Sequence, residues 1–207
     1  NNIYALSASN GTYIWNYSTA FGDRLQSSPA VANGIVYIGS QDNILYALNA
    51  STGALVWEYS TMSYPLEGGV DSSPAVSDGV VYIGSWDEKV YAMNASNGAI
   101  IWNSQLPNAI VWSSPTVANG MVYICVWESN DSDNFYALNA SNGAVIWSYQ
   151  TDNCLYSSPA VANGIVYFGS WDNNTYALNA SNGALVWNYS TGNGISTSPA
   201  IAGEVVY

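Results

Sequence analysis

Four copies of one loop place an aromatic or amide side chain where it could bind a ligand. Three copies read Ser-Gln-Asp or Ser-Trp-Asp, and the fourth has a Trp at the matching position. An aromatic ring stacks on the apolar face of a sugar, and a neighbouring carboxylate accepts hydrogen bonds from its hydroxyl groups. The candidate ligand-binding residues are Asp42, Trp86, Asp87, Trp127, Trp171 and Asp172. In the alternative interpretation, the rings cover strand ends and each Asp caps its own turn.

The densest acidic segment spans residues 128–134 and reads Glu-Ser-Asn-Asp-Ser-Asp-Asn. Alternating oxygen ligands of this kind can hold Ca²⁺, and Asp131 and Asp133 are the best candidates for such a site. The segment lacks the complete spacing of a calcium loop. A solvated polar loop is therefore the other interpretation.

The sequence contains no His, which removes the usual catalytic combinations. Neither a Ser-His-Asp nor a Cys-His arrangement can be built, and a zinc site would be without its commonest ligand. The 14 acidic residues fall mostly in turns, and none of their spacings is typical of a catalytic carboxylate pair. We therefore expect no enzymatic activity.

The two cysteines, Cys125 and Cys154, are expected at the end of one strand and in the next loop between repeats. In an oxidising compartment they could form a disulfide. Alternatively, Cys125 is a buried substitute for the Gly that other repeats carry at this position.

Charge excludes several classes of partner. The 207 residues include two cations, Arg24 and Lys89, and the net charge is −12. Two cations are too few to neutralise a phosphate backbone, and we therefore expect no nucleic-acid partner. For the same reason we expect no binding to anionic membranes. No apolar run approaches the roughly 18 to 20 residues that cross a bilayer.

The pattern Asn-x-Ser/Thr, the acceptor for N-glycosylation, occurs throughout the chain. It predicts attached sugar and therefore an extracellular or cell-surface location. Alternatively, Asn and Ser are simply abundant turn residues, and several copies repeat one motif. The candidate acceptors are Asn10, Asn16, Asn49, Asn94, Asn130, Asn139, Asn173, Asn179 and Asn188.

A repeat with a spacing of 40 to 45 residues runs through the whole chain. Each copy reads Ser-Pro-Ala-Val, a turn, Val-Tyr-Ile-Gly-Ser, a second turn, Tyr-Ala-Leu-Asn-Ala-Ser-Asn-Gly and a Trp, with small variations. This is the length of one four-stranded propeller blade. The repeated tryptophans are Trp15, Trp57, Trp102, Trp147 and Trp187.

The turns and strands of the repeat predict an all-β fold. Both turns carry Asn-Gly or a close relative, such as Asn33-Gly34, and this is the strongest short-range hairpin signal because both residues tolerate positive φ. The strands between them, such as residues 34–39, are apolar on both faces and must be covered on both sides, as in stacked blades. No helical period appears.

The chain begins with the second half of a repeat and ends with the first half. Four whole units lie at about 27–60, 72–104, 113–149 and 157–190, and the halves are 2–18 and 196–207. We predict that the halves pair and close one domain, residues 1–207, into a five-bladed β-propeller of four-stranded antiparallel blades. Alternatively, the chain is an excerpt of a longer propeller, or its halves pair with a neighbouring subunit and form a polymer.

In a propeller, the candidate ligand-binding loops and the loops between blades share one face. That face is also expected to collect Trp112, Tyr64 and Tyr156. As a set, these rings and carboxylates form the candidate ligand site.

The repeat resembles that of the pyrroloquinoline quinone (PQQ)-like propeller superfamily. The family pattern Ala-x-Asp-x-x-Thr-Gly-x-x-x-Trp reads here from Ala47 to Trp57, with Asn49 in place of the Asp. Either residue can bond the turn backbone. In the family, the repeated Trp packs between blades, so the resemblance implies a structural role for the five repeated tryptophans.

The superfamily contains quinone-dependent dehydrogenases and also non-catalytic members. The catalytic branch binds a quinone with several carboxylates, a calcium ion and, in many members, a vicinal disulfide. This chain has two cations, no His and two cysteines that are far apart in the sequence. The resemblance therefore implies the non-catalytic branch, with no PQQ.

Together these observations favour a non-catalytic extracellular or cell-surface propeller that serves as a structural or protein-interaction module. It would be glycosylated and assembled into a layer or filament, with other protein subunits or copies of itself as partners. The alternative is a lectin-like propeller that binds surface glycans. A fragment of a quinone-dependent dehydrogenase is the remote third interpretation.

Overall fold

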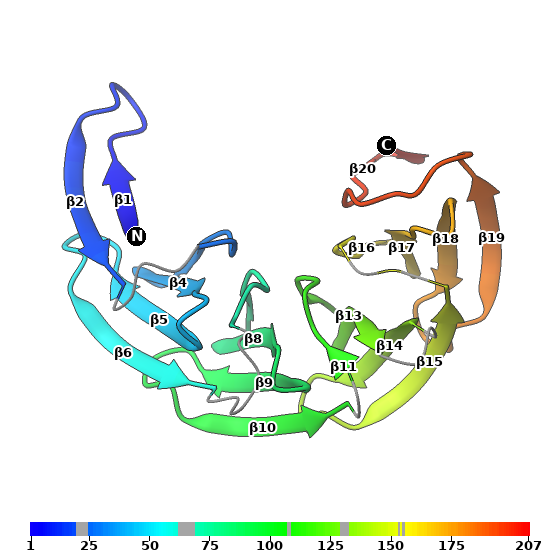
Figure 1. Ribbon diagram of the computed structural model, residues 1–207, viewed down its shortest axis with the longest axis horizontal. Coiled ribbons are helices and arrows are strands. Elements are labelled where there is room, and N and C mark those ends of the chain that lie inside the picture. The colour runs from blue at the N-terminus through cyan, green and yellow to red at the C-terminus, as the bar shows by residue number, and fades with distance from the viewer. Residues whose placement is uncertain (20–24, 62–68, 107–108, 129–132, 153, 155) are drawn as a thin grey trace.

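The computed structural model describes residues 1–19, 25–61, 69–106, 109–128, 133–152, 154 and 156–207. Within these ranges every helix or strand assigned is a β-strand, as the repeat predicts. The strands form separate sheets that follow one another around an open arc, with the chain ends at its two tips (Figure 1). Among these residues there is no helix long and apolar enough to span a membrane.

Four sheets correspond to the whole repeats, and each is antiparallel with its main strands in chain order. The first contains β3 (Ala30–Ala32), β4 (Ile35–Gly39), β5 (Ile44–Asn49) and β6 (Leu55–Ser60). The second contains β7 (Ala75–Ser77), β8 (Val80–Ser85), β9 (Lys89–Asn94) and β10 (Ile100–Gln105). The third contains β12 (Thr116–Ala118), β13 (Met121–Glu128), β14 (Asp133–Asn139) and β15 (Val145–Thr151), and β11 (Ala109–Ile110) also pairs with β13. The fourth contains β16 (Ala160–Ala162), β17 (Ile165–Gly169), β18 (Asn174–Asn179) and β19 (Leu185–Ser190).

Two-stranded sheets lie at the tips of the arc. One pairs β1 (Asn2–Leu6) with β2 (Tyr13–Ser18), and the other pairs β20 (Ile201–Ala202) with β21 (Val205–Val206). The predicted closure of a five-bladed ring by pairing these halves within one chain is wrong, because the two sheets are separate and lie apart (Figure 1).

The first turn of each whole repeat has the predicted hairpin geometry. Asn33 and Gly34 have φ values of 50° and 76°, and the same signs recur in the next three repeats, as a type I′ turn requires. The second turn differs, since only its Gly is left-handed, as at Gly53 with a φ of 71°. There Asn49 Oδ1 accepts the backbone N–H of Ser51 at 2.9 Å. The Asn that replaces the family's Asp therefore bonds the turn backbone, as expected.

Neighbouring blades are joined by the Trp of each repeat. Trp57 Nε1 and the Tyr37 hydroxyl both donate to the carbonyl oxygen of Ala95 in the next blade, each at 2.9 Å. The Trp57 ring lies over Gly98, where an added Cβ would come within 2.8 Å of the ring. The same indole bond joins Trp15 to Ala50, Trp102 to Ala140 and Trp147 to Ala180.

Apolar side chains fill the spaces between the blades in four clusters. In one cluster, Leu45 and Trp57 of the first whole blade pack with Ile83, Tyr91 and Met93 of the second. All five are at most 9% exposed. Strands that are apolar on both faces are thus buried between neighbouring sheets, as the sequence predicts.

A second connection between blades runs through the Ser-Ser-Pro segments, and we call it the serine ladder. The backbone N–H of the second Ser in one blade donates to the hydroxyl oxygen of the second Ser in the next. The rungs join Ser28 to Ser73 at 2.8 Å, Ser73 to Ser114 at 2.9 Å, Ser114 to Ser158 at 3.1 Å and Ser158 to Ser198 at 3.0 Å. The ladder links the loops that precede the first strand of each whole blade. These loops therefore lie side by side.

Candidate functional site

Two of the predicted ligand-binding carboxylates cap their own loops. Asp42 Oδ2 accepts the hydroxyl of Tyr46 at 2.7 Å, and Asp172 Oδ2 accepts that of Tyr176 at 2.8 Å. The other oxygen of each Asp accepts a backbone N–H two residues later in the chain. Burial, followed by the hydrogen bond to Asp172, raises the pKa of Tyr176. These contacts agree with the interpretation of turn caps rather than that of ligand-binding groups.

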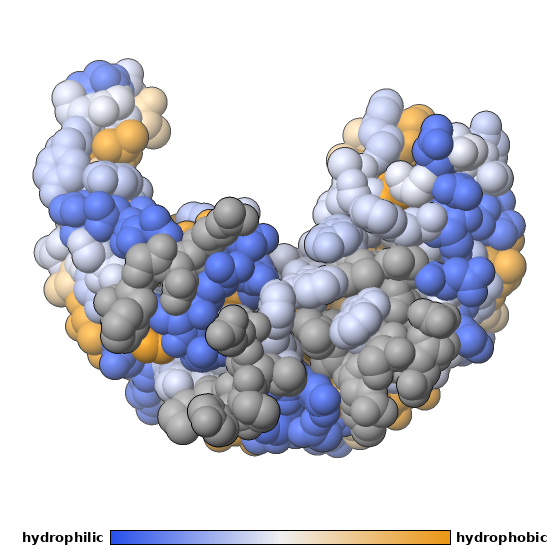
Figure 2. All heavy atoms as spheres, in the orientation of Figure 1, coloured by the Kyte–Doolittle hydropathy of each residue, from blue (hydrophilic) through white to orange (hydrophobic). Residues whose placement is uncertain are grey.

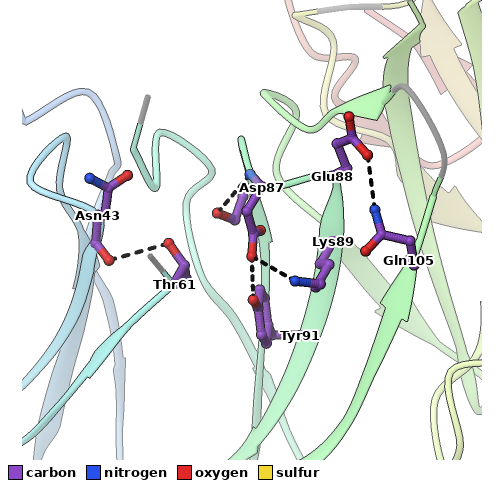
Figure 3. A network of polar contacts seen from close by, with 8 residues as sticks. Asn43, Thr61, Asp87, Glu88, Lys89, Tyr91 and Gln105 are labelled. Carbon is purple, nitrogen blue, oxygen red and sulfur yellow. Dashed lines mark hydrogen bonds and ion pairs between the residues drawn. The ribbon is translucent and has the colours of Figure 1, made fainter. Parts of the chain in front are cut away.

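The third carboxylate, Asp87, lies in a polar network (Figure 3). Its Oδ2 accepts hydrogen bonds from the Tyr91 hydroxyl and from Lys89 Nζ, the latter at 3.3 Å. Burial, followed by the hydrogen bond to Asp87, raises the pKa of Tyr91, which therefore remains a proton donor. Next to it, Gln105 Nε2 donates to Glu88 at 3.0 Å. Lys89 is the single Lys or Arg side chain that the structure describes, and it is committed to this network.

The predicted aromatic residues do come together. Trp86, Trp112, Trp127, Tyr156 and Trp171 form a continuous group of rings, which we call the aromatic array. The centroid of Trp112 lies 5.2 Å from Trp86, 6.1 Å from Trp127 and 5.6 Å from Tyr156. The rings of Trp112 and Tyr156 are nearly parallel, at 5°, and Tyr156 lies 5.9 Å from Trp171. Tyr156 and Trp171 are 49% and 51% exposed, which makes them the most exposed rings of the array.

A groove of about 370 Å³ lies beside the aromatic array. Trp86, Trp112 and Tyr156 form its aromatic lining. Its polar lining consists of Gln26, Gln41, Asp71 and three serines of the ladder, Ser73, Ser114 and Ser158. Each of these serine hydroxyls accepts a backbone N–H and retains its own proton to donate. The groove therefore combines flat apolar surfaces with several hydrogen-bonding groups.

Asp71 is the least satisfied polar residue of the groove. Its Oδ2 accepts Gln41 Nε2 at 3.4 Å, but its Oδ1 is buried and has no hydrogen-bond partner among the described residues. Trp86 Nε1 is also buried without a hydrogen-bond partner among the described residues, and it lies near enough to Asp71 to affect the pKa of that carboxyl. Burial raises the pKa of Asp71, and the nearby Gln41 and Trp86 donors offset part of this effect. An unsatisfied buried polar atom costs about 1–3 kcal/mol, so a hydroxyl group placed here would be stabilised.

Two positions of the repeat supply most of the groove. The residue before Ser-Ser-Pro is Gln26, Asp71, Trp112 or Tyr156, and the residue between Ser and Asp is Gln41, Trp86 or Trp171. Sequence reasoning identified the aromatic members but missed Gln26, Gln41 and Asp71. The available signal was that these two positions differ from copy to copy while their neighbours barely change.

The predicted calcium site falls outside the described part of the chain. Asp131 lies in an undescribed segment, and for Asp133 the backbone alone is described. Arg24 and Tyr64 also lie outside the described residues. Among the residues whose placement is described, no group of three or more His, Cys, Asp or Glu side chains could hold a metal ion.

The structure does not join Cys125 and Cys154, which both lie in its described part, by the expected disulfide. They are 0% and 1% exposed and belong to the same core cluster. Cys154 Sγ approaches the carbonyl oxygen of Asn134 at 3.7 Å instead of pairing with sulfur. The backbone N–H of Cys125 donates to Ser113 Oγ at 2.9 Å, as the Gly at this position does in other repeats.

The candidate glycosylation sites fall into two groups. Four belong to the repeated turn, where they are half-buried and the Asn Oδ1 accepts the backbone N–H two residues later; they are Asn49, Asn94, Asn139 and Asn179. Four others are exposed, namely Asn10, Asn16, Asn173 and Asn188. Asn130 lies outside the described residues.

Comparison with known proteins identifies the family. A family model described as outer membrane protein assembly factor BamB matches residues 1–109 and residues 60–207, which together include the whole chain. The chain belongs to this PQQ-like repeat family. No curated protein matches it at a significant level.

Solved structures of the PQQ-like repeat family share the fold. BamB from Moraxella catarrhalis superposes with a TM-score of 0.78 and 22% identity, over 97% of this chain and 61% of its own. The quinohemoprotein alcohol dehydrogenase ADHIIG from Pseudomonas putida HK5 superposes with a TM-score of 0.75 and 21% identity, over 87% of this chain and 36% of its own. A europium-containing methanol dehydrogenase superposes with a TM-score of 0.77 and 15% identity, over 92% of this chain and 47% of its own. The chain thus spans less than two thirds of each of these relatives.

A quinone cofactor does not fit the described residues. Its carboxylates would need cationic partners, and the one described cation, Lys89, is bonded to Asp87. The groove beside the aromatic array carries Asp71, which would repel an anionic ligand when charged. Membership in the PQQ-like repeat family therefore does not extend to a recognisable quinone site in the described residues.

Proposed function

We propose that this chain is a non-catalytic interaction module of an extracellular surface. In this proposal it joins other subunits that carry the same repeat, through the uncovered side of the sheet of β1 and β2 and the uncovered part of the sheet that contains β19. The match to the BamB family supports a binding role, and the carboxylates that serve as turn caps support the absence of catalysis.

The exposure of Trp187 is the observation that carries the proposal. Trp187 is 38% exposed, whereas its four counterparts are 6–9% exposed because each is covered by the next blade. Beside it lies a hollow of about 280 Å³, lined among others by Tyr189, Ile195 and Val206. At the internal junctions this space is filled by apolar side chains of the following blade, such as those of the cluster around Trp57.

The other tip of the arc presents the complementary surface. Gly11 matches the glycines that lie under the internal tryptophans, and an added Cβ there meets nothing within 4 Å. Tyr4 and Leu6 are 59% and 56% exposed, while their equivalents Tyr91 and Met93 are 3% and 0% exposed. The sheet of β1 and β2, placed over Trp187 of a neighbouring chain, would thus reproduce an internal junction. Such a head-to-tail contact yields rings or filaments.

Apolar residues on the convex side of the arc also support an interaction role. The outer strands β6, β10, β15 and β19 each expose two apolar side chains beside the repeated Trp, and orange patches lie on the outer rim in Figure 2. Exposed apolar patches commonly mark contact sites. These residues are Leu55, Val56, Ile100, Ile101, Val145, Ile146, Leu185 and Val186.

The exposed acceptor sequences at Asn10, Asn16, Asn173 and Asn188 support the extracellular location and glycosylation in this proposal. Sugar at these positions would also add the solubility that a chain with 8% charged residues otherwise lacks.

Sedimentation velocity over the micromolar range tests the association. We expect the wild-type chain to form concentration-dependent oligomers and the Trp187→Ala variant to be monomeric, because the ring that enters the junction is lost. Trp171→Ala, which removes an exposed Trp outside the end faces, is the matched control and should associate like the wild type. A wild-type chain that remains monomeric throughout would refute the proposal.

A further inference from the structure

We propose that the groove beside the aromatic array binds a neutral oligosaccharide. This inference goes beyond the interaction role, because it concerns a different surface from the two end faces. It rests on the side chains that line the groove, on the unsatisfied atoms within it and on the charge around it.

The variation between repeats indicates that the groove residues are not needed for blade packing. The Ser-Ser-Pro segments around them keep the same hydrogen bonds from blade to blade. By contrast, the residue before Ser-Ser-Pro changes from Gln26 to Asp71, Trp112 and Tyr156. All four of these side chains line one groove. Positions that vary in an otherwise uniform repeat and meet at one groove are typical of residues that select a ligand.

The aromatic lining suits the apolar face of a pyranose ring. Tyr156 is about half exposed, and the ring of Trp112 lies parallel to it with the two centroids 5.6 Å apart. Stacking of this kind fixes the orientation of the exposed ring, so little conformational entropy is lost when a ligand stacks on it. Trp171, 5.9 Å from Tyr156 and also about half exposed, offers a second stacking surface beside the groove for the next sugar unit.

The polar lining suits hydroxyl groups in particular. Asp71 Oδ1 and Trp86 Nε1 are buried beside the groove near one another and form no hydrogen bond among the described residues, and a sugar hydroxyl could accept from the indole and donate to the carboxylate. The amides of Gln26 and Gln41 and the ladder hydroxyls offer further donors and acceptors in the same groove. A purely apolar ligand would leave these groups without partners.

Charge selects a neutral ligand over an anionic one. The chain carries a net charge of −12, Asp71 lies in the groove, and the one described cation is paired with Asp87 elsewhere. A phosphorylated or uronic sugar would therefore be repelled. A quaternary ammonium group is the competing ligand for aromatic rings beside a carboxylate. The amides and hydroxyls of the groove favour the sugar, since an ammonium of this kind makes no hydrogen bonds.

Isothermal titration calorimetry with maltohexaose, cellohexaose and mannohexaose tests the proposal. At least one of these should bind the intact chain. Asp71→Asn keeps the shape of the groove but removes a carboxylate acceptor, and Tyr156→Ala removes a stacking surface. Each variant should weaken binding by about tenfold or more. Tyr13→Ala, which removes a Tyr on β2 that is 61% exposed and lies outside the groove lining, is the control and should bind like the wild type.

Thermal melts of every variant, followed by circular dichroism, separate lost binding from lost folding. Binding of a hexasaccharide that Asp71→Asn and Tyr156→Ala weaken without a change in melting temperature would support the site. The proposal is overturned if none of the three sugars binds, or if binding survives both substitutions. It is also overturned if tetramethylammonium binds the groove and the sugars do not.

Discussion

Trp57 lies so closely over Gly98 of the next blade that an added Cβ would approach its ring to 2.8 Å. Gly98 also has a φ of 71°, in the left-handed region. Two separate effects therefore require glycine here, one from the local backbone and one from the neighbouring blade.

Substituting Gly98 and Gly79 by Ala separates these effects. Gly79 has a similar φ of 77°, but an added Cβ there meets nothing within 4 Å. We expect Gly79→Ala to lower the free energy of unfolding by about 1–2 kcal/mol through backbone strain alone. Gly98→Ala should lose about 1–3 kcal/mol more, because the methyl group pushes the Trp57 ring out of the junction. Urea denaturation measures both values, and equal losses for the two variants would contradict the packing described for the junction.

The raised pKa of Asp71 predicts how the stability of the folded chain changes with pH. Burial raises its pKa above the ordinary value of 3.8, so in the folded state it holds its proton at pH values where the unfolded chain has lost it. Its contribution to stability is therefore present at low pH. That contribution decreases as pH rises from the ordinary Asp value through the raised one. Melting temperatures between pH 3 and about pH 7 should show this decrease in the wild type relative to Asp71→Asn. Parallel pH profiles of the two proteins would show that Asp71 does not titrate as described.

The two buried cysteines predict a simple labelling result. Because no disulfide joins Cys125 and Cys154 in the structure and both are at most 1% exposed, Ellman's reagent should react slowly with the native chain and rapidly after denaturation. The denatured chain should yield two thiols without any reductant. A yield of none before reduction would instead show that the two sulfur atoms are bonded to each other.

Short-range chemistry explains what the sequence could predict of this fold. Asn33-Gly34 predicts a hairpin because both residues accept positive φ, and both have positive φ in the structure. The apolar strand Ile35–Gly39 requires cover on both faces, and neighbouring sheets provide it. Such features depend on residues that are close in the chain, and the same residues recur in each repeat.

Ring closure and the groove could not be derived in the same way. Closure depends on the sum of small rotations between blades, which no single residue encodes. Asp71 was missed as a groove residue because its neighbours in space, Gln41 and Trp86, belong to other loops. The same limit applies to Asp42, whose carboxylate bonds Tyr46 rather than pointing toward a ligand.

The serine ladder predicts the order in which the blades unfold. Each rung connects one blade only to its immediate neighbours, so stability along the arc is a chain of local couplings. Blades at the tips are held from one side, while those in the middle are held from both. Opening should therefore begin as fraying at either tip and advance inward one blade at a time, with Ser114 in the last segment to exchange its amide protons with solvent.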